Sequence, residues 1–188
     1  MKKISIALGV LLVGAVVAFA FVNNSAPADK KSSDTPQAAE GTITWMNWDD
    51  AVKAAEKNKK KVFVDCYTDW CGWCKKMDAS TFKDPEVVAY MNKHFYAVKF
   101  NAEQKEPITW RGNTFNYFDG GGRRGVHQLA YSLLDGRLGY PSFVYLDENF
   151  DRVTISPGFK DPNGLMQELK WVAEGHFKTQ SFQEYSGQ

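Results

Sequence analysis

The sequence predicts an α/β protein in which helices cover both faces of a central mixed sheet. Strand-like segments alternate with segments whose apolar residues recur at helical spacing. The run Val62-Phe63-Val64 is typical of a central strand that is buried on both faces. Hydrophobic residues make up 44% and aromatic residues 14% of the 188 residues, which excludes a wholly disordered chain.

The first half of the domain predicts the order strand, helix, strand, helix, helix, strand. A short strand is expected within residues 42–46, and a helix over 48–58 ends in lysines that complement its dipole. A strand over 61–67 leads into a helix. Asp84-Pro85 begins the next helix, because aspartate is a good N-cap and proline suits the first helical position. A strand over 95–101 follows.

The second half predicts a loop, a helix, a two-stranded hairpin and a last helix. Residues 102–125 hold aromatic side chains among glycines and asparagines, and we expect an irregular surface loop there. Apolar spacing predicts a helix over 126–134. Strands at 142–146 and 152–156 form the hairpin, and Asp161-Pro162 begins the last helix. The pattern leaves the polar tail, residues 176–188, without an assigned structure.

The first 22 residues have the pattern of an export signal. Met1-Lys2-Lys3 is a positive start, and residues 4–22 carry no charge. Ala18-Phe19-Ala20 fits the small-x-small pattern before a cleavage point. The apolar run approaches the ~20 residues that span a bilayer, so an uncleaved membrane anchor is the alternative. Residues 23–41 are polar and rich in alanine, serine and proline, and we expect a flexible linker before a domain over 42–175.

Charge and cysteine content narrow the function classes. Lys and Arg number 23 against 22 Asp and Glu, a formal net charge of +1, which gives no basis for a nucleic-acid partner. Three cysteines are too few for a disulfide-stapled scaffold, but they can supply one reactive pair.

That pair is Cys71 and Cys74, which stand where the strand over 61–67 ends and a helix begins. A helix N-terminus presents free N–H groups and partial positive charge, which stabilise a thiolate and lower the pKa of Cys71. The two-residue spacer brings Cys74 one helical turn away, close enough for a disulfide. We expect Cys71 to lie at the exposed end of the turn and attack a substrate disulfide. Cys74, deeper beneath it, would resolve the mixed disulfide.

Other chemistries for this pair stay open on the residues alone. A zinc site needs two further ligands, and the chain offers only Cys66 and three scattered histidines. Haem attachment requires a histidine directly after the second cysteine, where this chain has Lys75. A purely structural disulfide is the third alternative, although a disulfide that closes so short a loop at a helix start stabilises a fold only a little. We predict neither a metal nor a cofactor.

Two separated motifs carry a resemblance to the thioredoxin superfamily. Residues 62–75, VFVDCYTDWCGWCK, resemble its active-site strand, turn and helix, and residues 139–143, GYPSF, resemble its cis-proline segment. The nearest resemblance is to the C-terminal periplasmic thioredoxin-like domain of the thiol:disulfide interchange protein DsbD, to which residues 81–87 are also similar. The resemblance extends over residues 42–173. It implies a thioredoxin-like fold with a long insertion, residues 102–139, before the cis-proline segment.

The resemblance implies roles for an acid and a lysine near the cysteines. Asp65 matches the buried acid beneath them, whose raised pKa lets it shuttle the proton of Cys74. Lys99 matches a lysine often found near that acid and is a candidate proton-relay partner. Without the resemblance, Asp65 would be a satisfied acid at a strand end and Lys99 an ordinary exposed strand residue.

The resemblance also implies a substrate-binding surface. Pro141 would be cis, which turns the backbone of Tyr140 toward the cysteines, where a substrate peptide can pair as an added strand. A trans proline is the alternative. Trp70, Gly72 and Trp73 would frame the reactive thiol for docking.

Together these residues predict an exported, periplasmic thiol:disulfide oxidoreductase that is soluble or anchored through residues 4–22. Protein thiols and disulfides are the expected substrates, and a membrane or soluble thiol the electron donor. We favour reduction of protein disulfides over oxidation or isomerisation, and a redox-inert peptide-binding module is the alternative of another class. The Gly-Trp spacer differs from the Gly-Pro of ordinary thioredoxin, so a strongly reducing potential is not assumed. Cys66 is expected to be buried and inert, or else a third redox thiol.

Overall fold

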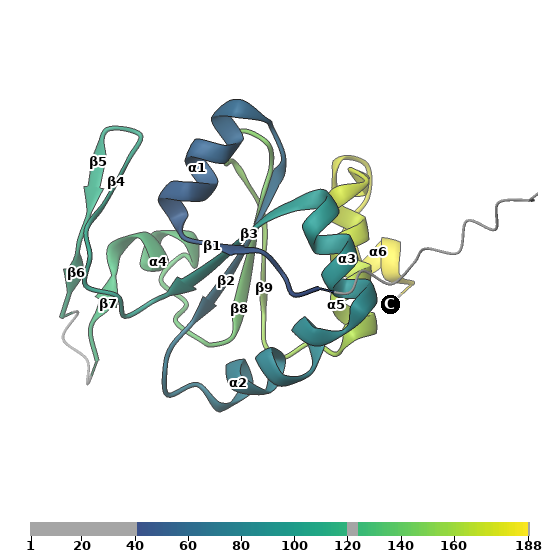
Figure 1. Cartoon of the computed structure of the whole chain (residues 1–188), viewed down its shortest axis with the longest axis horizontal. Coiled ribbons are helices and arrows are strands. Elements are labelled where there is room, and N and C mark those ends of the chain that lie inside the picture. Colours follow the sequence, from purple (N-terminus) through teal and green to yellow (C-terminus); the bar gives the residue numbers. More distant parts are fainter. Residues whose placement is uncertain (1–40, 120–123, 188) are drawn as a thin grey trace, which may run out of the picture. The chain divides into compact units, whose positions relative to one another are not determined.

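The computed structural model describes residues 41–119 and 124–187, which fall within one compact unit (Figure 1). The signal or anchor predicted for residues 1–22, the linker up to residue 40 and positions 120–123 of the insertion lie outside the described residues. The first elements are β1 (Trp45–Met46), α1 (Trp48–Lys57), β2 (Lys61–Tyr67), α2 (Gly72–Ala79), the 3-10 turn η1 (Thr81–Lys83), α3 (Pro85–His94) and β3 (Phe95–Asn101). The insertion holds β4 (Ile108–Trp110), β5 (Asn113–Phe115), β6 (Tyr117–Phe118), β7 (Val126–His127) and α4 (Gln128–Leu133). The last elements are β8 (Ser142–Leu146), β9 (Arg152–Pro157), α5 (Pro162–Ala173), η2 (His176–Lys178) and α6 (Phe182–Ser186).

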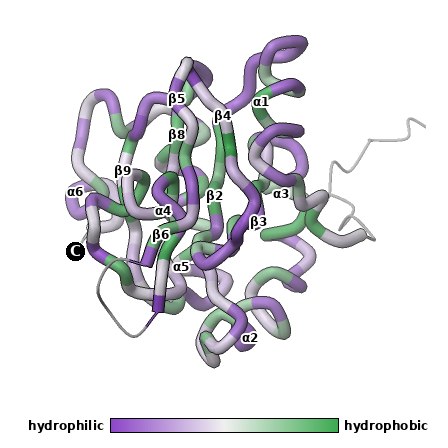
Figure 2. The backbone as a smooth tube through the Cα atoms, turned by 90° about the vertical axis from the view of Figure 1, so that its left-hand side faces the viewer, coloured by the Kyte–Doolittle hydropathy of each residue, from purple (hydrophilic) through white to green (hydrophobic). Residues whose placement is uncertain are grey.

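Five strands form one mixed sheet in the order β1-β3-β2-β8-β9. The pairs β1–β3 and β3–β2 are parallel, whereas β8 is antiparallel to both β2 and β9. β2 lies at the centre, and residues 62–66 are completely or almost completely buried, as the apolar run predicts. In Figure 2 the hydrophobic colour is concentrated along these central strands. The predicted central mixed sheet is confirmed.

Helices cover both faces of the sheet, and the alternation of side chains along β2 decides what each face receives. Val62, Val64 and Cys66 pack in one core cluster with residues of α1 and α4. Phe63 packs in the other cluster with residues of α2, α3 and α5. Asp65 is two residues after Phe63 and therefore shares its face, so it lies on the α2 side of the sheet.

Local signals fix where several helices begin. Asp84 caps α3 by accepting the N–H groups of Glu86 and Val87, and Pro85 occupies the first turn, as expected. Asp161 caps α5 in the same way through the N–H of Gly164. In the tail, whose structure the sequence pattern left unassigned, Ser181 caps α6, and Phe182 packs on Trp171 of α5 at 5.7 Å between ring centroids.

The expectation of an irregular loop over residues 102–125 is wrong. β4 and β5 form a hairpin that projects from the sheet, and β6 pairs with β7 (Figure 1). The physical reason is the turn Arg111-Gly112, whose φ values of 49° and 76° give the doubly left-handed backbone that two-residue hairpins favour. The helix expected over 126–134 is also too long, because Val126 and His127 belong to β7 and the helix begins at Gln128.

His127 anchors the insertion to the domain. Its backbone N–H donates to the carbonyl of Ala102 at 2.7 Å, and its ring is fully buried. Nδ1 accepts the N–H of Leu129 and thereby caps α4, while Nε2 lies 3.1 Å from the carbonyl oxygen of Glu106. Burial lowers the pKa of this ring. Because Nδ1 accepts the N–H of Leu129, Nε2 is the nitrogen that can donate to Glu106.

Candidate active site

The two cysteines lie where β2 passes into α2. The N–H of Cys71 donates to the carbonyl of Thr68 at 3.1 Å, which closes the turn after the strand. Cys71 is the N-cap of α2, and its sulfur accepts the N–H of Cys74 at 3.1 Å. The two sulfurs form a disulfide, with 5.3 Å between the Cα atoms. The sulfur of Cys71 therefore occupies the position where the helix presents free N–H groups and partial positive charge.

The expectation that Cys71 lies exposed above a deeper Cys74 is wrong for this disulfide form. The exposed fractions are 3% for Cys71 and 2% for Cys74, so both are buried. The reason is the capping geometry, in which the side chain of Cys71 folds back onto the end of α2 and not into solvent. The two cysteines therefore differ in their contact with the helix end and not in their exposure.

Asp65 is a buried acid on the same face of the sheet as α2. Its exposed fraction is 1%, and burial raises its pKa to about 6, against the opposing charge and hydrogen bond of Lys99. Oδ2 accepts the Lys99 ammonium at 2.6 Å. Among the described residues Oδ1 has no hydrogen-bond partner, although it is fully buried. One oxygen of a carboxyl group that titrates near neutrality is thus free to take a proton.

Lys99 reaches Asp65 because the two residues are register partners in the parallel pair β2–β3. The Lys99 ammonium also bonds Asp78 of α2, so one lysine holds two carboxylates. Burial lowers the pKa of Lys99, but the two carboxylates together raise it above its ordinary value. The charged lysine lies over the rings of Trp45, Tyr67 and Phe82, with 4.9–5.2 Å to the ring centroids.

On one side of the dithiol, Trp70 is half-exposed and held by its neighbours. Its indole N–H donates to Oε1 of Glu103 at 2.9 Å. Tyr140 meets its ring edge-on at 6.0 Å between centroids, and the guanidinium of Arg124 lies over the ring at 5.1 Å. Glu103 and Arg124 both belong to the insertion, residues 102–139. The predicted insertion therefore contacts Trp70, the residue before Cys71.

Tyr140 precedes Pro141, and the peptide bond between them is cis. Both residues come directly before β8, whose first residue, Ser142, pairs with Cys66 of β2. Within the described part of the chain, no backbone hydrogen bond engages the amide or carbonyl of Tyr140. A second polypeptide could therefore form hydrogen bonds with the amide and the carbonyl of Tyr140.

On the other side of the dithiol, Trp73 of α2 is the most exposed large aromatic side chain of the described residues, at 56%. It packs on Phe159 at 5.4 Å between ring centroids. The ammonium of Lys76 lies over both rings, at 4.8 Å and 5.0 Å. Gly72 opens the helix, and a Cβ there would meet no atom within 4 Å, so the space beside Cys71 is open at this position.

Cys66 lies on the opposite face of the sheet from Asp65. It is fully buried in the cluster with α1 and α4, and burial raises the pKa of its thiol, assisted by the charge of Asp65. Of the two interpretations that the sequence left open, this position favours an inert core thiol.

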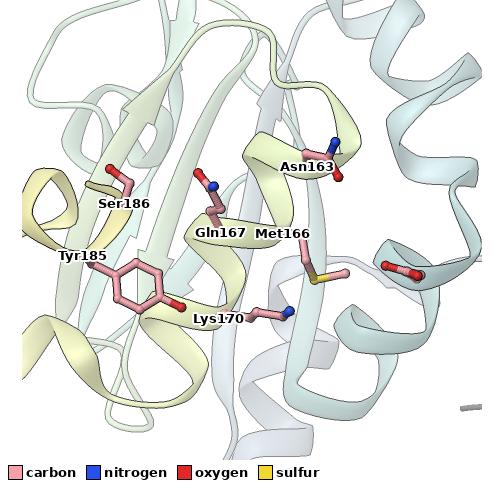
Figure 3. Close-up of a pocket in the computed structure, with 7 residues that line it drawn as sticks. Asn163, Met166, Gln167, Lys170, Tyr185 and Ser186 are labelled. Carbon is pink, nitrogen blue, oxygen red and sulfur yellow. The ribbon is translucent and has the colours of Figure 1, made fainter. Parts of the chain in front are cut away.

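A cavity away from the dithiol lies between α3, α5 and α6 (Figure 3). Its volume is about 660 Å³, and its lining includes Asn163, Gln167, Lys170 and Tyr185, none of them a predicted site residue. Within residues 41–119 and 124–187, no three His, Cys, Asp or Glu side chains cluster as a metal site would require. In the same ranges, no helix has both the length and the apolarity needed to cross a membrane.

Sequence reasoning missed four residues that surround the dithiol. Asp78, Glu103, Arg124 and Phe159 are far from the motif or unremarkable within it. A weak signal existed for Asp78, because four residues after Cys74 is the next turn of the same helix face. For the other three, only the tertiary contacts identify the role.

Parts of the chain are similar in sequence to known proteins. The family model Thioredox_DsbH, described as a protein of unknown function (DUF255), matches residues 25–113. Spermatogenesis-associated protein 20 of Homo sapiens is 26% identical over 80 residues, which is 42% of this chain. An uncharacterized protein of Caenorhabditis elegans is 28% identical over 80 residues. These matches cover only 10% and 11% of the relatives' own lengths.

Solved structures match over most of the described domain. The DsbH oxidoreductase superposes with a TM-score of 0.52 at 19% identity, covering 74% of this chain and 89% of that one. A thioredoxin from Thermus thermophilus gives 0.52 at 18% identity, with coverages of 70% and 88%. A proposed disulphide-isomerase from Bacteroides thetaiotaomicron gives 0.50 at 26% identity, with coverages of 70% and 92%. With its five-stranded mixed sheet, its helices on both faces and its Cys71–Cys74 disulfide at the start of α2, the chain has the fold of the thioredoxin superfamily.

Proposed function

We propose that this chain catalyses thiol–disulfide exchange with protein substrates and acts as an exported reductase of protein disulfides. The observation that carries the proposal is the Cys71 sulfur at the N-cap of α2, where it accepts the N–H of Cys74. The same N–H and the helix dipole would stabilise the thiolate after reduction. We therefore expect the pKa of the Cys71 thiol to lie below that of a free cysteine.

The proposed reaction proceeds in two exchanges. The Cys71 thiolate attacks one sulfur of a client disulfide; a Cys71–client disulfide forms, and the other client sulfur leaves as a thiolate that takes up a proton. Cys74 then loses its proton and attacks the sulfur of Cys71, which releases the second client thiolate. The client disulfide gains two electrons, and the protein dithiol loses two as it becomes the disulfide. A membrane or soluble thiol donor would return the protein to the dithiol.

Asp65 supports the second exchange. Cys74 must give up a proton inside the protein, and a buried carboxyl with a pKa of about 6 and an unpartnered oxygen is suited to take it near neutral pH. In a reductase, this resolution by Cys74 is the step that releases the client. Lys99 acts through Asp65, because its charge lowers the pKa that burial raises.

Client binding would use the free backbone of Tyr140. Among the described residues its amide and carbonyl form no backbone hydrogen bond, so they can form strand-like hydrogen bonds with an extended client segment. Pro141 would help to shape this segment, Trp70 and Trp73 would contact client side chains on either side, and Gly72 would leave room for the approach.

The test is insulin reduction by the full chain with a dithiol as electron source. Cys71→Ser should abolish turnover, and Cys74→Ser should accumulate a mixed disulfide with the client, seen by non-reducing electrophoresis. Cys66→Ala is the matched control and should retain turnover. A folded, reduced wild-type chain that turns over neither insulin nor a small disulfide would refute the proposal and favour the redox-inert peptide-binding module.

Isomerisation is the second candidate, supported by the proposed disulphide-isomerase to which the chain is 26% identical. Equilibration with glutathione separates the two directions. A potential near that of thioredoxin, about −270 mV, supports a reductase, whereas one near that of protein disulfide isomerase, about −180 mV, supports the isomerase or oxidase.

We propose the periplasm as the location, on the evidence of the sequence pattern of residues 1–22. A cleaved signal leaves a soluble protein with residues 23–41 as a leading tether, a domain over 42–175 and a tail over 176–188. An uncleaved segment 4–22 leaves the domain anchored. N-terminal sequencing of the protein recovered from the periplasmic and membrane fractions distinguishes the two cases, and recovery in the cytosol alone would contradict export.

A further inference from the structure

A cation lies over each of the two tryptophans that flank the dithiol. Lys76 lies over Trp73 and Phe159, and Arg124 lies over Trp70. Both tryptophans are about half-exposed, at 50% for Trp70 and 56% for Trp73. Both cationic residues are themselves exposed. A polypeptide that docks on these rings would therefore meet a positive charge on each side of Cys71.

These cations are not neutralised by neighbours in the described residues. Neither Lys76 nor Arg124 forms an ion pair there, whereas Lys99 and Arg152, for example, are both paired with carboxylates. The first turn of α2 contains no acidic residue, and Lys75 adds a second exposed cation. We call the residues around Trp70 and Trp73 the rim of the site; on its Trp73 side, Lys75 and Lys76 are both exposed and unpaired among the described residues.

The side chains around Trp70 carry charges of both signs. Glu103 accepts the indole N–H of Trp70, and Asp69 is exposed beside it. These carboxylates offset part of the charge of Arg124. A charge preference at this site should therefore depend more on Lys76 than on Arg124.

We propose that this rim selects client disulfides whose cysteine has aspartate or glutamate next to it, with Lys76 and Arg124 as the specificity-determining residues. The inference rests on the proposed function, because it names the substrate class of the same dithiol. The aromatic rings would bind apolar client atoms, and the cations over them would attract the client carboxylates. Exposed charge pairs of this kind change an equilibrium or a rate by about 1.5- to 5-fold each.

The experiment measures the rate constant of exchange between the reduced full chain and three disulfide peptides. The peptides have the same length and carry aspartate, asparagine or lysine beside the cysteine. We expect the rates to fall in that order at low ionic strength. Lys76→Gln should slow the aspartate peptide about 2- to 5-fold, and Arg124→Gln less, while the asparagine peptide changes little with either variant. Lys53→Gln, an exposed lysine of α1, is the matched control and should affect no peptide.

Salt supplies a readout that a structural defect would not change. Raising the ionic strength from about 0.1 M to 1 M shortens the Debye length from ~10 Å to ~3 Å and should remove the aspartate preference without slowing the asparagine peptide. Equal rates for the three peptides, or equal losses for the aspartate and asparagine peptides in Lys76→Gln, would overturn this inference and leave the proposed function standing. Absence of exchange with every peptide and with insulin would overturn both.

Discussion

Replacing Asp65 by asparagine should change how the stability of the domain depends on pH. The unfolded carboxyl has a pKa of 3.8, whereas burial raises the folded value to about 6. Between these values the folded state keeps a proton that the unfolded state has lost. The stability that the protonated carboxyl contributes is therefore fully present below pH ~4 and is lost as the pH rises through about 6.

The size of this loss follows from the two pKa values. A shift from 3.8 to about 6 corresponds to about 3 kcal/mol in the free energy of unfolding. An asparagine side chain would keep the shape of the aspartate but bind no proton. Lys99, which still has Asp78 as a partner, would not be left alone in the protein. The Asp65→Asn variant should therefore lack this component of the pH dependence.

The assay is chemical denaturation of both proteins, with the Cys71–Cys74 disulfide intact, at several pH values between 4 and 8. Relative to Asp65→Asn, the wild type should lose about 2.5 kcal/mol of stability between pH 4 and pH 7.5, because part of the effect is already gone at pH 4. Parallel pH profiles would refute the assigned pKa. A wild type that gains stability with rising pH, relative to the variant, would show that Lys99 outweighs burial.

Further predictions concern the lysine, the hairpin, the insertion anchor and the buried thiol. Lys99→Met removes the charge that lowers the pKa of Asp65, so the midpoint of the same pH profile should move above about 6; an unchanged midpoint would contradict the coupling. Gly112→Ala places a Cβ at φ +76° with no atom within 4 Å, so denaturation should show a loss of about 1 kcal/mol from backbone strain alone, and an unaltered midpoint would argue against the left-handed turn. His127→Ala removes the cap of α4 and a buried ring, at a cost of about 2–4 kcal/mol; a loss under about 1 kcal/mol would show that the insertion is anchored elsewhere. Cys66 should resist alkylation in the native protein and react only on unfolding, as mass spectrometry of iodoacetamide-treated samples would report; rapid native labelling would revive its role as a redox thiol.

The regular part of the fold was predictable because local signals and tertiary packing agree there. The strands over 61–67 and 95–101 have the predicted bounds, and Asp84 and Asp161 cap the helices they were expected to begin. The structure of residues 102–139 was harder to predict from the sequence. Its strands are only two or three residues long, too short for alternation to show, and the turn that organises them depends on Arg111 adopting a left-handed backbone that its residue type does not predict.

The candidate site was likewise only partly predictable from the sequence. Cys71 and Cys74 could be placed from spacing and from the strand-to-helix transition alone. The pairing of Asp65 with Lys99 needed the register of β2 against β3, which no local pattern reports. The expected exposure of Cys71 was wrong because capping, a local side-chain geometry, overrides the position of the residue at the start of the turn.

If Asp65 accepts the proton of Cys74, as we propose, neither burial nor an ion pair alone would suit that role. Burial by itself would hold the carboxyl protonated, so it could not take the proton of Cys74 near neutral pH. A fully effective ion pair would hold it ionised, so it would bind a proton too weakly to accept one. In this chain the two effects oppose each other and leave the pKa at about 6, and Asp78, which shares the lysine, further raises the pKa of Asp65. Under the proposed function, a carboxyl balanced in this way would accept a proton during resolution and release it before the next exchange.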